Sequence, residues 1–130
     1  MSELIHPSFS KIEAMLPELR TMPQAQCVEK HHFGPGIYVK ELTMPAGSIV
    51  IGKPHKTEHL CVMLQGRMKF LKQDGELVEL VAPMTFVGKP GRKVAYIIET
   101  VVFQNIFATD ETDIEKLENM FVENPLLEGN

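Results

Sequence analysis

The chain has 130 residues, a formal net charge of -4 and 44% hydrophobic residues, which is the size and composition of one globular domain. No stretch reaches the roughly 20 apolar residues of a membrane span, and residues 1–10 lack the basic and apolar regions of a signal peptide. Cys27 and Cys61 have no CxxC spacing, which favours two reduced thiols over a disulfide framework or a zinc finger. We therefore expect one domain over 1–130 in a soluble, cytoplasmic protein.

The first predicted element is a short helix over about 10–20. Ser10 and Glu13 have the spacing of a capping box, and an apolar stripe follows them. From about residue 26 to residue 108 the chain changes to short β-rich runs separated by Gly and Pro, and Asp74-Gly75 is the best hairpin turn. The predicted strands are 26–32, 36–44, 48–51, 58–65, 67–72, 77–81, 85–87, 93–98 and 101–107.

The last predicted element is an amphipathic helix over about 112–123. Thr112 and Glu115 repeat the capping-box spacing, and Ile114, Leu117 and Phe121 share one face. We expect this helix to pack across one sheet. Because the strands are short and regularly spaced, the pattern favours an antiparallel sandwich or barrel over βαβ units.

Charge is distributed unevenly along the chain. Residues 108–130 contain seven acids and one base, whereas residues 53–93 contain eight bases and four acids. The basic segment indicates a small anionic molecule as a partner, but it is too sparse and interrupted for duplex nucleic acid. Nothing in the sequence indicates a membrane partner.

Two histidines mark the stretch that could carry chemistry. His55 follows Gly52 and Pro54 in a predicted loop, and His59 begins an apolar β run. A loop ligand and a strand ligand can converge at a barrel mouth, where imidazole commonly binds a divalent transition metal such as Zn, Fe, Mn or Ni. The sequence therefore predicts a metal or ligand site at His55 and His59.

This stretch resembles the first motif of the cupins, G-x5-H-x-H-x3,4-E-x6-G. Gly47 and Gly66 fall on its glycine positions, His55 on its second His, and His59 on its Glu. The run Lys89-Pro90-Gly91 echoes the start of the second motif. The resemblance covers about 37–108 and also extends to uncharacterised cupins of phages and prophages.

The resemblance implies an all-β fold, a double-stranded β-helix (jelly-roll) cupin barrel over about 26–108, with a short N-terminal helix and a C-terminal amphipathic helix. It also implies a homodimer. The metal motif is degenerate, since Lys53 occupies the position of the first His and Val94 that of the last. A third ligand would have to come from Glu58, Tyr96, Gln104, Asn105, His31 or His32.

Strand alternation assigns side chains to the two faces of the run after His59. Cys61, Met63 and Gln65 should share the His59 side and line the cavity. Cys61 could be a ligand or a reactive thiol, although a buried apolar role is more common. The outward positions, expected to pack on a helix or another subunit, are Leu60, Val62 and Leu64.

Three functions are compatible with these residues. The first is a metal-dependent enzyme in which His55 and His59 hold the ion, and Lys53, Arg92 or Tyr96 orients the substrate or moves a proton.

The second is a binding module without turnover that holds an anionic metabolite or nucleotide. The candidate ligand-binding residues are Lys53, Lys56, Cys61, Met63, Arg92, Lys93 and Tyr96. The third is an assembly scaffold that dimerises through its outer apolar faces.

Overall fold

The computed structural model describes residues 17–18, 21, 25–71 and 76–123. The predicted helix over about 10–20 lies almost entirely outside them, as does the Asp74-Gly75 turn. Within the described residues no helix is long and apolar enough to span a membrane. The elements are β1 (Val28–Gly34), β2 (Ile37–Met44), β3 (Ile49–Ile51), β4 (His59–Leu71), β5 (Leu77–Val81), β6 (Met84–Gly88), β7 (Val94–Ala108) and α2 (Ile114–Phe121).

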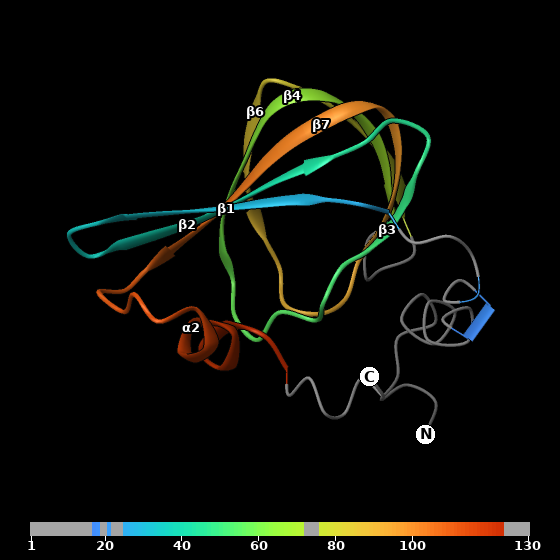
Figure 1. Ribbon diagram of the computed structural model, residues 1–130. Helices are drawn as coiled ribbons and strands as arrows, with labels where there is room; N and C mark the ends of the chain where they lie inside the picture. Colours follow the sequence, from blue (N-terminus) through green and yellow to red (C-terminus); the bar gives the residue numbers. More distant parts are fainter. Residues whose placement is uncertain (1–16, 19–20, 22–24, 72–75, 124–130) are drawn as a thin grey trace.

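The described strands form one antiparallel sheet in the order β1-β2-β7-β4-β5, with β3 added to β7 and β6 added to β4. Figure 1 shows the long strands β4 and β7 curving over the top of the molecule, with α2 below the β1-β2 hairpin. The prediction of a mostly antiparallel β fold with a C-terminal helix is therefore confirmed.

Two predicted interruptions are wrong. The runs expected at 58–65 and 67–72 are one strand, β4, and those at 93–98 and 101–107 are one strand, β7. The two strands stay paired past Gly66. The register shifts between Met63 and Gln65, between Gln65 and Arg67, and between Arg67 and Met68. Such bulges bend a strand without ending it, which is how a long pair curves around a barrel.

Gly66 makes this bend possible. Its φ is 98°, a left-handed backbone conformation that residues other than glycine rarely adopt. A Cβ at this position would lie 2.2 Å from the backbone oxygen of Thr100, on the paired strand. Glycine is therefore required here both by the backbone angle and by the close approach of β7.

The main core fills the inside of the curved sheet. On β4 the side chains of His59, Cys61 and Met63 are buried, while Leu60 and Leu64 are exposed, as alternation predicts. Gln65 is exposed rather than inward, because the register shift after Met63 reverses the alternation. The core cluster consists of Met44, Cys61, Met63, Met68, Ala95, Ile97, Val101 and Phe103.

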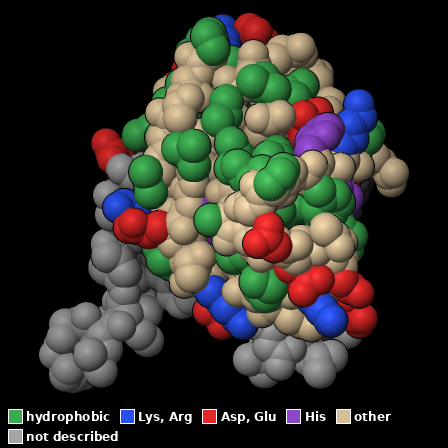
Figure 2. Space-filling model, turned by 90° about the vertical axis from the view of Figure 1, so that its left-hand side faces the viewer, with side chains coloured by type: hydrophobic (Ala, Val, Ile, Leu, Met, Phe, Trp, Pro, Cys, Tyr) green, Lys and Arg blue, Asp and Glu red, His purple; other side chains and the backbone are tan. Residues whose placement is uncertain are grey.

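Large apolar side chains are also exposed on the outside of the sheet. Leu60 on β4 pairs with Val87 on β6, and both side chains are about half exposed, at 42% and 51%. Figure 2 shows a face where hydrophobic side chains gather, with charged ones towards its margins. The homodimer implied by the cupin resemblance stays a prediction.

Helix α2 is shorter than predicted, and its N-cap is Asp113 rather than Thr112. The Asp113 carboxylate accepts a hydrogen bond from the backbone N–H of Lys116 at 3.1 Å. The helix packs Leu117, which is 1% exposed, against Tyr38 and Phe107. It therefore covers the inner side of β2 and β7 at one end of the barrel.

A shared carboxylate ties α2 to the barrel. Glu118 accepts hydrogen bonds from Lys40 of β2 at 3.0 Å and from Lys53 of the loop after β3 at 2.9 Å. Partial burial alone would raise the pKa of Glu118, but the hydrogen bonds and charges of Lys53 and Lys40 outweigh it and hold the pKa below its usual value.

The Gly66 bend can be tested with a pair of glycine substitutions. Gly36 also has a positive φ, 72°, but has open space around its missing Cβ. We expect Gly36→Ala to cost about 1 to 2 kcal/mol of unfolding free energy. Gly66→Ala should cost about 3 kcal/mol or more, because strain and backbone overlap combine. Equal losses in urea unfolding would contradict the close approach.

The Glu118 ion pairs predict a pH-dependent stability. Because its pKa is depressed in the folded state, its contribution is full above the unfolded pKa and is lost as pH falls through the folded value. Glu118→Gln should cost about 1 to 2 kcal/mol at pH 7, and the difference from wild type should shrink below about pH 4. Glu58→Gln, at the exposed Lys89 pair, is the control and should change stability little. A pH-independent loss would refute the assignment.

Candidate functional site

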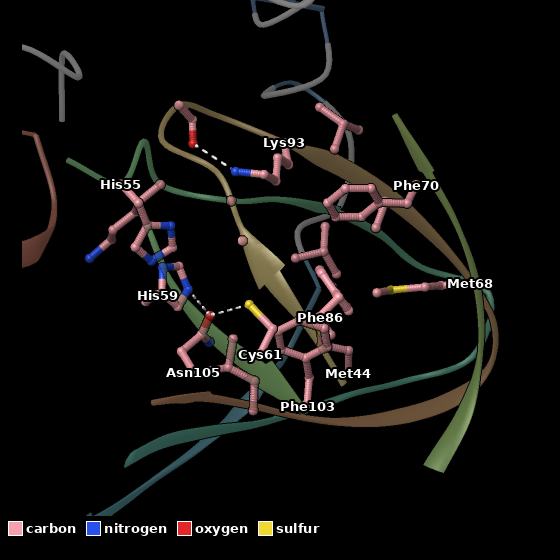
Figure 3. A pocket seen from close by; sticks show the side chains of 18 residues that line it. Met44, His55, His59, Cys61, Met68, Phe70, Phe86, Lys93, Phe103 and Asn105 are labelled. Atoms are coloured by element: carbon pink, nitrogen blue, oxygen red, sulfur yellow. Dashed lines mark hydrogen bonds between the residues drawn. The ribbon is translucent and has the colours of Figure 1, made fainter. Parts of the chain in front are cut away.

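A pocket of about 110 Å³ lies inside the barrel. His55, His59 and Asn105 lie at one end of it, and Met68 and Phe70 lie at the other (Figure 3). Most of its wall is apolar. The other lining residues are Leu42, Met44, Val50, Gly52, Lys53, Cys61, Phe86, Gly88, Gly91, Lys93, Val94, Ala95 and Phe103.

The polar end is built by β4, β7 and the loop before β4. The rings of His55 and His59 are 4.6 Å apart between centroids. Nε2 of His59 lies 2.8 Å from Oδ1 of Asn105, which is the register partner of Cys61 on β7. With the amide oxygen as acceptor, Nε2 is the donor in this contact, and Nδ1 lies 3.4 Å from the carbonyl oxygen of Thr57. Asn105 thus orients the imidazole that the sequence singled out.

An aromatic stack supports His59 from behind. Its ring stacks on Phe107 of β7 with a centroid distance of 4.7 Å, and Phe107 stacks on Phe121 of α2 at 4.2 Å. The backbone N–H of Lys56 donates to the Phe121 carbonyl at 2.9 Å, which joins the His55 loop to the end of α2. Helix α2 therefore holds both histidines in place without lining the pocket itself.

Burial decides the protonation of two groups at this end. Burial, together with the nearby His59 and Lys93, lowers the pKa of His55 to about 3, so its ring is neutral at pH 7. Burial raises the pKa of Cys61 to about 11. Cys61 is therefore a thiol rather than a thiolate at pH 7, and its Sγ points toward Oδ1 of Asn105 at 3.9 Å.

The pocket wall is electropositive. Among the described residues that line it there are two lysines, Lys53 and Lys93, and no carboxylate. Lys53 is paired with Glu118, whereas Lys93 donates to the backbone carbonyls of Lys89 and Gly91. Burial lowers the pKa of Lys93 from its usual value. Of the two lining lysines, Lys93 is therefore the one that forms no ion pair with a carboxylate of the described residues.

Four of the predicted ligand-binding residues are not brought to the pocket. Lys56 is exposed and its Nζ donates to the Asn119 carbonyl at 2.7 Å. Met63 is fully buried in the core, and Tyr96 is 47% exposed because it follows the inward-facing Ala95 on β7. Arg92 is 6% exposed and donates to the Gly52 carbonyl at 3.2 Å, between the inward neighbours Gly91 and Lys93. The predicted residues that do line it are Lys53, His55, His59, Cys61 and Lys93.

The possible third metal ligands are mostly engaged elsewhere. Glu58 pairs with Lys89, His31 with the Tyr38 hydroxyl, and His32 and Gln104 with Glu41. Asn105 is the member of that set that reaches the pocket. Over 25–71 and 76–123 no group of three or more His, Cys, Asp or Glu side chains could hold a metal ion. The donors available are two imidazoles and one amide oxygen, fewer than the three or four charged or imidazole ligands of a zinc site.

Sequence reasoning missed the apolar depth of the pocket. Met68 and Phe70 come from the second half of β4, and Phe86 and Phe103 from β6 and β7. Their alternation along each strand was visible in the sequence. What was not visible was that these apolar side chains and the two histidines point into the same pocket.

Comparison with known proteins assigns the fold. No protein-family model and no curated protein sequence matched the chain. Among solved structures, ectoine synthase from P. lautus has a TM-score of 0.58 at 11% identity, covering 75% of this chain and 74% of that one. A cupin domain from Bordetella pertussis Tohama I has a TM-score of 0.52 at 16% identity, covering 68% and 98%.

A third similar structure is the Cupin_2 domain of an XRE family transcriptional regulator from Enterobacter cloacae, with a TM-score of 0.50 at 18% identity, covering 62% of this chain and 93% of that one. At these identities the similarity concerns the backbone fold alone, because the same barrel carries unrelated activities. Together with the curved antiparallel sheet and its internal pocket, these matches show that the chain has the cupin fold.

Proposed function

We propose that this protein binds a small anionic molecule in its barrel pocket and holds it without turnover. The single observation that carries the proposal is Lys93, a partly buried cation in an otherwise mostly apolar wall, with backbone carbonyls as its hydrogen-bond partners. A buried charge without an opposite charge is costly. An anion in the pocket would remove that cost.

The ring of His55 supports the same proposal. It lines the pocket and is neutral at pH 7, and the described residues offer its ring nitrogens no side-chain hydrogen bond. Buried polar groups are nearly always satisfied in native proteins. A bound anion could accept a hydrogen bond from this ring while it pairs with Lys93.

The lining also favours binding over catalysis. Cys61 is protonated at pH 7, and no carboxylate from the described residues lines the pocket, so a general base would have to be one of the two imidazoles. Lys53, which stands at the position of a cupin metal ligand, is engaged by Glu118. Its role here is to tie the loop to α2.

A divalent metal at His55 and His59 is the second candidate. Two adjacent imidazoles, with Asn105 beside them, are donors that transition metals accept. Such an ion would act as a Lewis acid or as the anchor of an anionic ligand. The incomplete ligand set predicts weak binding and makes this the less favoured function.

The anion proposal predicts a thermal shift that depends on Lys93. Sodium acetate at ten times its Kd, with ionic strength held constant by NaCl, should stabilise the fold by about 1.4 kcal/mol. This corresponds to a rise in Tm of about 5 °C for a domain of this size.

Lys93→Met should abolish the shift, because it keeps the length of the side chain and removes the charge. Lys89→Met, at an exposed pair with Glu58, is the matched control and should keep the full shift. A shift that is equal in both variants would overturn the proposal.

The metal candidate is tested by elemental analysis of protein purified without a His tag. A metal site requires near-stoichiometric Zn, Fe, Mn or Ni that both His55→Ala and His59→Ala remove. His32→Ala is the control, because His32 lies against Glu41 outside the pocket. Metal content below about a tenth of an ion per chain, or metal retained in both variants, rejects this candidate.

A further inference from the structure

The depth of the pocket offers almost no polar partner to a ligand. Beyond the histidines, the wall is formed by Val50, Met68, Phe70, Phe86 and Phe103, and Figure 3 shows the labelled members of this group on the side away from His55. Met68 and Phe103 are 2% and 8% exposed. Hydroxyl, amide or charged groups placed there would lose their hydrogen bonds to water and gain none.

The size of the pocket limits what can enter. An apolar cavity of about 150 Å³ accommodates benzene, a six-carbon ring. The volume of about 110 Å³ found here therefore takes about four carbons on the same scale.

Lys93 sets the orientation of a ligand. Its Nζ donates to the backbone carbonyls of Lys89 and Gly91. Figure 3 shows the side chain pointing toward the end of the pocket where His55 lies. The anionic group of a ligand would thus lie beside Lys93 and His55. Whatever is attached to that group would extend toward Met68 and Phe70.

The charge count argues for a single negative charge. Lys53, the other lining lysine, is already paired with Glu118, which also forms an ion pair with Lys40. A second carboxylate on the ligand would have to lie against the apolar depth without a partner. We therefore expect the pocket to discriminate against dicarboxylates, sugars and phosphoesters with polar bodies.

We propose that the ligand is a monocarboxylate with a short apolar tail of about four carbons, its carboxylate at Lys93 and His55 and its tail in the depth lined by Met68 and Phe70. This inference rests on the proposed anion binding and adds the chemical class of the ligand.

The test is a series of straight-chain carboxylates from acetate to octanoate, with Kd measured by calorimetry at constant ionic strength. Each methylene buried should tighten binding about fourfold. We expect this gain to stop after about four tail carbons, where the pocket is full. Succinate should bind at least tenfold more weakly than butyrate, because its second carboxylate would be buried unpaired.

Two variants separate the tail from the head. Ala95→Leu places a larger side chain into the depth beside Val50 and Phe70, and should abolish the gain per methylene while acetate binding remains. Ala108→Leu, at the exposed end of β7, is the control. A measurement on unaltered protein accompanies them: methyl NMR signals of Met44 and Met68 should shift with pentanoate, and that of the exposed Met120 should not.

The outcomes distinguish the two proposals. Acetate binding that depends on Lys93, with no gain along the series and no shift at Met44 or Met68, overturns the apolar tail and leaves the anion site standing. Binding of 1-pentanol as tight as that of pentanoate, unaffected by Lys93→Met, overturns the anion site itself. Binding of octanoate far tighter than that of hexanoate contradicts the size limit and with it the tail assignment.

Discussion

The pairing of β4 with β7 is the constraint on which the rest of the structure depends. These two strands carry His59, Cys61 and Asn105 at one end of the pocket and Met68 and Ala95 toward the other. They can bring both ends into one cavity only because they bend together, and the bend passes through the bulges around Gly66. A straight pair would place the histidines and the apolar residues on one flat face, with no enclosed space between them.

The second constraint is the closure of one barrel end by α2. Glu118 joins the helix to β2 and to the loop after β3, and Phe121 stacks on Phe107, which in turn backs His59. The acidic helix thus neutralises Lys40 and the lining residue Lys53, whereas the other lining lysine, Lys93, has no such partner among the described residues. Of the two lining lysines, Lys53 is therefore offset by a carboxylate and Lys93 is not.

The position of a residue within a motif predicted its location better than its role. Lys53 occupies the motif position of a cupin metal ligand and lines the pocket. Its Nζ, however, donates a hydrogen bond to Glu118, 65 positions away. Arg92 and Tyr96 were predicted as ligand-binding residues from their neighbourhood, but they do not line the pocket, whereas the neighbouring Lys93 and Ala95 do. A one-residue difference in register decides such assignments, and a sequence without partners does not reveal the register.

By itself, the sequence determined the β-rich body, the C-terminal helix and the neighbourhood of His55 and His59, because alternation, turn residues and capping patterns are local signals. It did not determine that β4 and β7 continue through their apparent breaks, because a bulge can be identified only from the pairing with the neighbouring strand. Nor did it determine that Asn105, Lys93 and the apolar residues of three strands converge on one small cavity. Those facts depend on contacts between residues far apart in the sequence, such as His59 with Asn105, 46 positions away, which only the closed barrel brings together.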